Sequence, residues 1–396
     1  MKFIHFADLH LGYENYSLTD EKTGLSTRLL GFLKCFDFLV KTALKEKVDF
    51  VFFTGDACKT REPAPIYVRE FAKRIKKLAD NNIKVIMIVG NHDIPNTQGK
   101  ADTLELFPTL KIKNVWVFSE IGLHTIDNVQ VLVVPWIFKN TLLTETDLKK
   151  PIDKQIKIFS QKLNQKVSDL LEKADSKKPL FLLAHYSTSG VVYSSGIEAV
   201  PSIEPQLSLS LLSDKKITYS ALGHIHKFQV LNDTPPVIMP GSIERIDFGE
   251  EKEEKGFILG EVKGKKVKWQ FVKTPATKFL TIKVKGKNLL KKIAQKAKIA
   301  QNAIVRVQLV GTEKELSTIS ELEIKKILKS AFMLVSVSKE TIETAEKKEV
   351  DLHSVEQMTM IDWLKKYLKV HKFSKKEQEE IIKTANELIE EAGVGE

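Results

Sequence analysis

The chain has 396 residues, 42% of them hydrophobic, which is enough for a core of about 250 residues and additional smaller modules. Its net charge of +11 suits a polyanionic partner such as nucleic acid, although a Lys- and Glu-rich thermophile surface would give a similar balance. Two cysteines, Cys35 and Cys58, exclude a disulfide scaffold. The chain has no signal peptide and no apolar run of membrane-spanning length, so we expect a soluble cytoplasmic protein.

Strands and helices alternate over the first ninety residues. We expect strands at 3–7, 48–54 and 84–89, where apolar runs are short and unbroken. Between them, residues 28–47 and 63–82 have apolar side chains at helical spacing. This alternation predicts a layered α/β core with parallel strands.

The pattern continues beyond this region with further strands at 114–118, 129–135, 180–184 and 217–222. A Lys-rich helical stretch at 149–178 precedes the third of these strands. Residues 186–205 are dense in Ser, Gly and Pro, which predicts a long loop. Short β-runs over 229–274 predict a second sheet that closes the core.

A second, smaller α/β module is expected after Pro275. Its strands should cover 279–285, 303–310 and 333–338, and its helices 288–299 and 319–331. The alternative is an ordinary extension of the core sheet. Residues 341–350 are charged and indicate a linker.

Residues typical of metal ligands follow five of the predicted strands. These residues are Asp8, His10, Asp56, Asn91, His92, His185, His224 and His226. Any one of them could be a turn residue, a helix cap or a satisfied core histidine. However, the carboxyl ends of strands in an open α/β sheet meet at one crevice, so together these residues predict one shared site.

The ordered series Asp-x-His, Gly-Asp, Gly-Asn-His-Asp, a single His and Gly-His-x-His resembles the calcineurin-like metallophosphoesterase superfamily. Within it, residues 6–12 (Phe-Ala-Asp-Leu-His-Leu-Gly) and 240–250 (Pro-Gly-Ser-Ile-Glu-Arg-Ile-Asp-Phe-Gly-Glu) are similar to SbcD-type nuclease subunits of double-strand-break repair. The resemblance implies an α/β fold: a two-sheet metallophosphoesterase sandwich flanked by helices, with a small capping domain and a C-terminal helical hairpin.

The resemblance also implies a division of the chain into four parts. These are a nuclease core at 1–274, a DNA-capping domain at 275–340, a linker at 341–351 and a helix-loop-helix at 352–396 that binds a partner ATPase.

The ligand types favour a borderline divalent cation. Carboxylate and amide oxygens with neutral imidazoles, and no thiolate, suit manganese, with magnesium possible. By resemblance, the first of two Mn²⁺ ions is bound by Asp8, His10, Asp56 and His226. The second is bound by Asp56, Asn91, His185 and His224, so Asp56 bridges the two ions. Such a pair suits hydrolysis of a phosphoester.

His92 is not needed for this ligand set. By resemblance it is the catalytic residue that positions the phosphate or protonates the leaving alkoxide, and the alternative is a residue that orients a ligand. Asp93 is expected to brace either the loop or the histidine. Many family members have a second histidine shortly after Gly-Asp, whereas this chain has Lys59 there, either as a phosphate contact or as a surface residue.

Three function classes are compatible with these motifs. The first is a manganese-dependent DNA nuclease, acting as a 3′ to 5′ exonuclease and single-strand endonuclease. The second is a phosphatase or phosphodiesterase on non-DNA substrates, and the third is a non-catalytic scaffold. The complete ligand set argues against the scaffold, and the basic charge and extra modules favour DNA.

Two partners besides DNA follow from the resemblance. No Gly-x-x-x-x-Gly-Lys-Ser/Thr loop occurs, so energy-dependent steps would come from a separate SbcC-type coiled-coil ATPase. A homodimer is also expected, since Phe32, Phe36 and Phe38 give the first helix more large side chains than one buried face needs.

The C-terminal helices are predicted to bind that ATPase. Capping boxes begin them at Ser354 and Ser374, and two short helices cannot form a stable core alone. The expected contact residues are Met358, Ile361, Leu364, Leu368, Ile381, Ile382, Ala385, Leu388 and Ile389.

Overall fold

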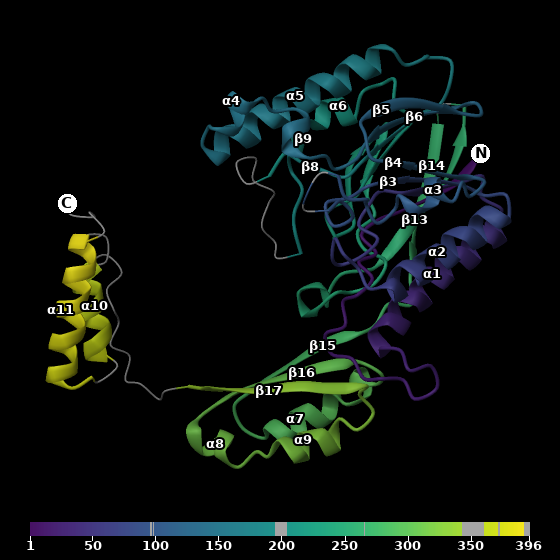
Figure 1. Cartoon of the computed structure of the whole chain (residues 1–396). Coiled ribbons are helices and arrows are strands. Elements are labelled where there is room, and N and C mark those ends of the chain that lie inside the picture. Colours follow the sequence, from purple (N-terminus) through teal and green to yellow (C-terminus); the bar gives the residue numbers. More distant parts are fainter. Residues whose placement is uncertain are drawn as a thin grey trace. The chain divides into compact units, whose positions relative to one another are not determined.

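The computed structural model describes residues 1–95, 97, 99–194, 204–264, 266–342, 360–370 and 373–391 (Figure 1). The chain divides into two compact units, Met1–Thr341 and Ile342–Glu396. The first unit contains two six-stranded sheets and a smaller three-stranded sheet. This arrangement confirms the expected α/β fold with two multi-stranded sheets.

The first large sheet has the strand order β14-β13-β1-β2-β3-β4. Its strands are β1 (Lys2–Phe6), β2 (Phe50–Phe53), β3 (Lys84–Ile88), β4 (Val115–Phe118), β13 (Gly256–Lys263) and β14 (Lys266–Lys273). The four strands from β1 to β4 are parallel, and β13 runs antiparallel to β1. Our prediction that all of 229–274 belongs to the second sheet is therefore wrong for β13 and β14, because β13 hydrogen-bonds along β1.

The second large sheet has the order β11-β12-β10-β7-β6-β5. Its strands are β5 (Gly122–Ile126), β6 (Val129–Val134), β7 (Leu180–Ala184), β10 (Tyr219–Leu222), β11 (Gln229–Asp233) and β12 (Pro236–Met239). The four central strands are parallel, and both edge strands are antiparallel to their neighbours. A short pair, β8 (Ser187–Thr188) and β9 (Gln206–Leu207), lies in and directly after the segment expected to be a loop.

Alternation along each strand decides which core a side chain enters. In β1, Phe3 joins a cluster with residues of both sheets, whereas Ile4 and Phe6 join a cluster with the helices α1 (Thr27–Glu46) and α2 (Pro65–Asp80). The second sheet packs in the same way against α5 (Ile152–Glu172). The sheets therefore face each other and have helices outside.

Shorter helical segments connect these elements. They are α3 (Leu106–Thr109), η1 (Lys139–Thr141), α4 (Glu145–Leu148), α6 (Leu209–Leu212) and η2 (Phe248–Glu250). The helix predicted at 149–178 begins only after Pro151 and ends at Glu172.

Two of the three large aromatic side chains of helix α1 are covered within the chain. Phe32 and Phe36 are fully buried, and Phe38 packs against Phe257. The core of the same chain therefore covers Phe32 and Phe36, whereas Phe38 is half-buried, and the homodimer stays a prediction.

The small module forms a separate parallel sheet in the order β15-β16-β17. Its elements are β15 (Phe279–Lys285), α7 (Leu289–Lys296), η3 (Lys298–Ala300), β16 (Ile304–Gly311), α8 (Glu313–Ser317), α9 (Glu321–Ile327) and β17 (Met333–Thr341). It has its own apolar cluster, which includes Ile282, Ile293 and Val307. Phe279 and Ile304 also pack on Phe248 of η2 in the core.

The C-terminal unit contains α10 (Met360–Val370) and α11 (Lys375–Glu391). The capping box at Ser374 forms, since the Glu377 carboxylate accepts from the Ser374 N–H and the Ser374 hydroxyl accepts from the Glu377 N–H. The box expected at Ser354 and most of the expected linker lie outside the described residues. Among the described helices, none is long and apolar enough to span a membrane.

His5 on β1 is fully buried between the two sheets. Its ring nitrogens contact the Tyr219 hydroxyl at 3.0 Å and the Thr54 hydroxyl at 3.1 Å. Burial lowers the pKa of His5 from 6.5 to about 3, although a hydrogen bond to the Leu222 carbonyl opposes the shift. The ring is therefore neutral in the folded chain.

This neutral histidine predicts acid sensitivity of the first unit. The unfolded chain takes up a proton near pH 6.5 and the folded chain only near pH 3, so stability falls as the pH is lowered between these values. In urea titrations from pH 7 to 4, wild type should lose up to about 1.4 kcal/mol per pH unit more than His5→Gln. A pH-independent difference between the two proteins would contradict this prediction.

Candidate metal centre

The ligand positions predicted from sequence lie at the carboxyl ends of strands from both large sheets. Four of these residues, Asp8, His10, Asp56 and His224, have φ angles of 52°, 48°, 63° and 87°. Residues other than glycine seldom adopt this left-handed conformation, and each instance costs on the order of 1–3 kcal/mol. Strained residues of this kind are concentrated at functional sites. The backbone conformation therefore indicates the same site as the sequence motifs do.

Two positions in the motifs require glycine because neighbouring turns of the chain lie very close to them. A Cβ atom on Gly90 would lie 2.2 Å from Asp56 Oδ1. A Cβ atom on Gly223 would lie 2.2 Å from the Thr54 carbonyl oxygen. Only glycine leaves room for the turns after β3 and β10 to meet the turn after β2.

The buried Asp93 carboxylate holds two of these turns together. Oδ2 accepts from the backbone N–H groups of Asp56 at 2.7 Å and Gly90 at 2.9 Å, and Oδ1 accepts from Ala57 at 2.8 Å. Burial and the charge of Asp56 raise the pKa of Asp93 to about 7, while the three donated hydrogen bonds oppose the shift. Of the two expected roles, Asp93 therefore has the one of bracing the loop.

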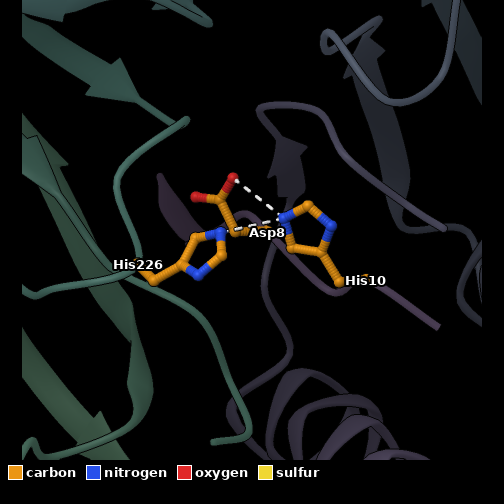
Figure 2. A group of neighbouring side chains, drawn as sticks. All are labelled: Asp8, His10 and His226. Carbon is orange, nitrogen blue, oxygen red and sulfur yellow. Dashed lines mark hydrogen bonds and ion pairs between the residues drawn. The ribbon is translucent and has the colours of Figure 1, made fainter. Parts of the chain in front are cut away.

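Asp8, His10 and His226 point toward one another (Figure 2). The Nε2 atoms of His10 and His226 are 2.9 Å apart. His10 Nε2 is also 4.0 Å from Asp8 Oδ1 and 3.5 Å from Asp56 Oδ2. These four residues, which we call the first group, are the set expected for the first ion.

A second group gathers around the Asn91 side chain. Its Oδ1 atom is 3.0 Å from His185 Nε2 and 3.1 Å from His224 Nδ1. Asp56 Oδ2 is 3.3 Å from His185 Nε2, so the Asp56 carboxylate belongs to both groups. The structure thus brings together all seven positions predicted as ligands.

His92 lies beside the first group, with its ring centroid 4.9 Å from that of His10. Its backbone N–H donates to Asp56 Oδ1 at 2.8 Å, and its Nδ1 atom is 2.7 Å from the Lys59 carbonyl oxygen. The Lys59 ammonium lies over the Tyr13 ring at 4.6 Å. Lys59 is therefore half-buried near the site rather than an ordinary surface lysine.

Two glutamates in contact with predicted ligand histidines were not predicted from sequence. Glu204 Oε2 is 2.8 Å from His224 Nε2, and Glu250 Oε1 is 3.0 Å from His226 Nδ1. Burial alone would raise the pKa of Glu250, but the hydrogen bond from His226 and the charge of Lys255 lower it to about 2. Glu250 ends the 240–250 motif, which was the only signal in the sequence that could have indicated it.

The donor atoms of the two groups fit divalent cations. Asp8 Oδ2 is buried without a hydrogen-bond partner among the described residues. At most one of the facing Nε2 atoms of His10 and His226 can donate to the other, and a shared cation would satisfy both. Carboxylate, amide and imidazole donors are typical of manganese and related ions.

The model of the calcineurin-like phosphoesterase family matches residues 1–228, more than half of the chain, so the chain belongs to this family. The family resemblance seen in the motifs is thereby confirmed. Members bind divalent metals, which agrees with the two groups of donor atoms.

Several curated relatives are DNA-repair proteins. The chain is 27% identical to the DNA double-strand break repair protein Mre11 of Methanococcus maripaludis, over 67% of this chain and 64% of the relative. It is 27% identical to the protein of the same name from Methanocaldococcus jannaschii, over 67% and 63%. It is 24% identical to a subunit of the nuclease SbcCD from Staphylococcus epidermidis, over 66% of each protein. The chain therefore spans just under two thirds of the length of these relatives.

A solved structure of a dimetal phosphatase from Danio rerio covers 69% of this chain and 99% of its own, with 12% identity. Its TM-score of 0.39 is too low to carry an argument.

Asp93→Asn should destabilise the first unit by about 1–3 kcal/mol, because an amide group has one oxygen and would leave at least one of the three N–H donors unpaired. Urea unfolding at pH 8, where the Asp93 carboxyl is ionised, measures the loss. Asp169→Asn on the exposed face of α5 is the matched control and should change stability by less than about 0.5 kcal/mol. Equal stability of the two variants would show that Asp93 does not brace the loop.

Proposed function

We propose that the chain is a two-metal DNA nuclease that processes DNA ends in double-strand-break repair. One observation carries the proposal: two groups of metal-type donors from two facing sheets share the Asp56 carboxylate, in a chain of the calcineurin-like phosphoesterase family. A non-catalytic scaffold would not be expected to retain all seven ligand positions.

In this proposal, Asp8, His10, Asp56 and His226 hold one Mn²⁺ ion, and Asp56, Asn91, His185 and His224 hold the other. Two ions held there would supply an acidified water molecule and positive charge beside the oxygens of a phosphoester. The protein itself contributes rigid placement, because the donors stand on turns fixed by buried strands and by Asp93. Mg²⁺ could replace Mn²⁺ at oxygen-rich positions.

His92 is proposed as the catalytic residue that moves a proton. Its Nδ1 atom is engaged by the Lys59 carbonyl oxygen, so a protonated His92 would keep Nε2–H available for another acceptor. A leaving alkoxide has a high pKa and needs such a proton. Since its ring also lies near His10 and Asp56, metal content must be measured along with turnover.

DNA is the proposed substrate for three reasons. Relatives are named for double-strand-break repair and as a nuclease subunit. The net charge is +11. The proposed capping domain at 275–340 has exposed lysines on its strand β15 and near α7, namely Lys283, Lys285, Lys291, Lys292 and Lys298, that could neutralise phosphates. The proposed activities are 3′ to 5′ exonuclease and single-strand endonuclease, and the cellular location is the cytoplasm.

Asp56→Ala and His224→Ala should abolish hydrolysis of every substrate, because each removes a ligand and Asp56 serves both ions. His92→Ala should keep two Mn²⁺ ions per chain and bind DNA, yet lose turnover by about 10²-fold or more. Elemental analysis and cleavage of labelled single- and double-stranded DNA measure both properties. His124→Ala, on the edge strand β5 beside Phe118, is the matched control.

Turnover by manganese-restored Asp56→Ala would contradict the two-metal mechanism. Metal loss in His92→Ala would instead assign His92 to the ligand set. The same assay separates DNA from other phosphodiesters: cleavage of bis-p-nitrophenyl phosphate without cleavage of DNA would favour the alternative of a non-DNA phosphodiesterase or phosphatase.

The C-terminal unit is proposed to bind an SbcC-type coiled-coil ATPase through an amphipathic helix pair. Leu368 is buried, whereas Leu388 is 59% exposed. Five other proposed contact residues are half-buried, namely Ile361, Leu364, Ile381, Ile382 and Ala385. Met358 and the side chain of Ile389 lie outside the described residues. Exposed apolar groups on short helices suit a helix-in-groove contact.

Truncation after Val350 should leave a folded nuclease that cleaves simple single strands but does not co-purify with the ATPase. Leu388→Glu should weaken the complex by about tenfold or more, since it places a charge in an apolar contact, while the neighbouring Asn386→Glu serves as the matched control. Undiminished affinity of the truncated chain would contradict the proposed contact. The homodimer remains a prediction from family resemblance.

A further inference from the structure

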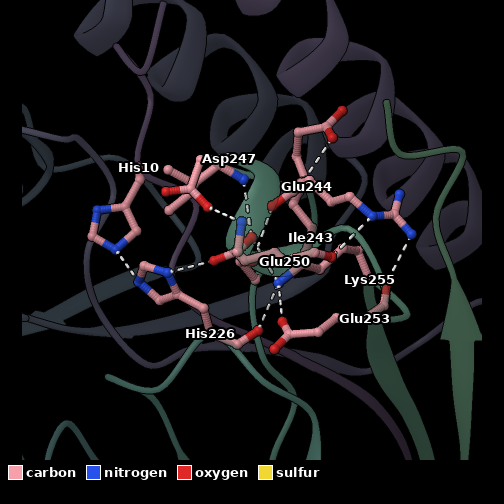
Figure 3. A network of polar contacts seen from close by, with 12 residues as sticks. His10, His226, Ile243, Glu244, Asp247, Glu250, Glu253 and Lys255 are labelled. Carbon is pink, nitrogen blue, oxygen red and sulfur yellow. Dashed lines mark hydrogen bonds and ion pairs between the residues drawn. The ribbon is translucent and has the colours of Figure 1, made fainter. Parts of the chain in front are cut away.

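The two histidines of the Gly-His-x-His segment direct opposite ring nitrogens at the two groups. His226 directs Nε2 at His10 and Nδ1 at Glu250 (Figure 3). His224 directs Nδ1 at Asn91 and Nε2 at Glu204. Two residues of the same type, two positions apart, therefore need opposite tautomers to offer a lone pair to a cation.

A neutral imidazole has one N–H group, and its position decides which nitrogen can bind a metal. A carboxylate accepts and never donates when ionised, so it holds the N–H on the nitrogen it faces. The other nitrogen then keeps its lone pair, and the negative partner makes that lone pair more basic. Glu250 thus leaves Nε2 of His226 as the nitrogen that can bind a cation, and Glu204 leaves Nδ1 of His224.

Glu250 is held in place by contacts separate from His226. Its Oε2 atom is 2.8 Å from the Lys255 ammonium and accepts from the Ile246 N–H at 2.9 Å. The fully buried Lys255 side chain also donates to the His226 carbonyl oxygen at 2.9 Å and binds the Glu253 carboxylate at 2.8 Å. These bonds leave Oε1 of Glu250 aimed at the imidazole.

Glu204 is held from another part of the chain. It accepts a hydrogen bond from the Tyr193 hydroxyl, and its side chain is only 14% exposed. Because Glu204 and Glu250 belong to separate segments, a change in one leaves the contacts of the other intact.

We propose that each histidine of Gly-His-x-His is oriented by its own glutamate, so that Glu250 sets the affinity of the first ion and Glu204 that of the second. Both act as positioning residues, since they work through the imidazoles. The inference rests on the proposed function only in that both ions must bind.

Mn²⁺ titration calorimetry of the whole chain tests the proposal. Wild type should bind two ions, and Glu250→Gln should weaken one of them by about 10–100-fold while the other keeps its wild-type affinity. The weakened ion should be the one lost in His226→Ala. Glu204→Gln should weaken the other ion, the one lost in His224→Ala.

Glu253→Gln is the matched control for Glu250→Gln, because it also removes a partner of Lys255, and it should bind both ions as wild type does. A general loss of structure would weaken both ions together, and that result, or unchanged binding by both glutamine variants, would overturn the proposal. If wild type itself binds no second ion, the proposed two-metal function fails instead.

The tautomers can also be measured without substitution at the glutamates. In zinc-loaded wild type labelled with ¹⁵N-histidine, long-range ¹H–¹⁵N spectra, assigned with His224→Gln and His226→Gln, should show the proton on Nε2 of His224 and on Nδ1 of His226. The same tautomer at both residues would overturn the proposal even if a glutamate variant failed to fold.

Discussion

The Asp56 carboxylate is the contact on which the rest of the candidate site depends. It follows β2 in the first sheet, and its Oδ2 atom lies within 3.5 Å of His10 from the same sheet and 3.3 Å of His185 from the second sheet. Its Oδ1 atom accepts the backbone N–H of His92. A carboxylate with almost no exposure to water is stable only among donors or cations, so both sheets must present such groups to it.

Bringing these buried polar groups together strains the backbone and so lowers the stability of the folded chain. Contacts close to the site offset part of this loss. Four site residues have a left-handed backbone conformation. At Gly90 and Gly223 the neighbouring turn lies so close that a Cβ atom would not fit. Asp93 offsets part of the cost by accepting three backbone hydrogen bonds. Farther out, Glu204 and Glu250 hold the two histidines of one turn, each through a different ring nitrogen. These outer contacts fix the histidines from the side facing away from the two donor groups.

Sequence patterns were sufficient for the central strands, because a strand buried on both faces reads as an unbroken apolar run, as in β2. They were insufficient for β5, β13 and β14. β5 includes Gly122, His124 and Thr125 and is mostly half-buried, so it has no such run. β13 and β14 read as strands, but only hydrogen bonding to β1 assigned them to the first sheet. Likewise, apolar spacing on α1 cannot tell that Phe32 and Phe36 are covered by the same chain.

The sequence by itself predicted the seven candidate ligand positions, since ligand types at the ends of parallel strands are local features and the family motif spaces them along the chain. It also indicated the bracing role of Asp93, which lies beside the turn that it supports. Only the tertiary structure decided that Glu204 and Glu250 stand behind His224 and His226, and which ring nitrogen each histidine turns inward. The physical reason is the distance along the chain: Glu204 is 20 residues from His224, and Glu250 is 24 residues from His226. Each pair comes together only when the chain folds, so no local sequence pattern predicts the contact.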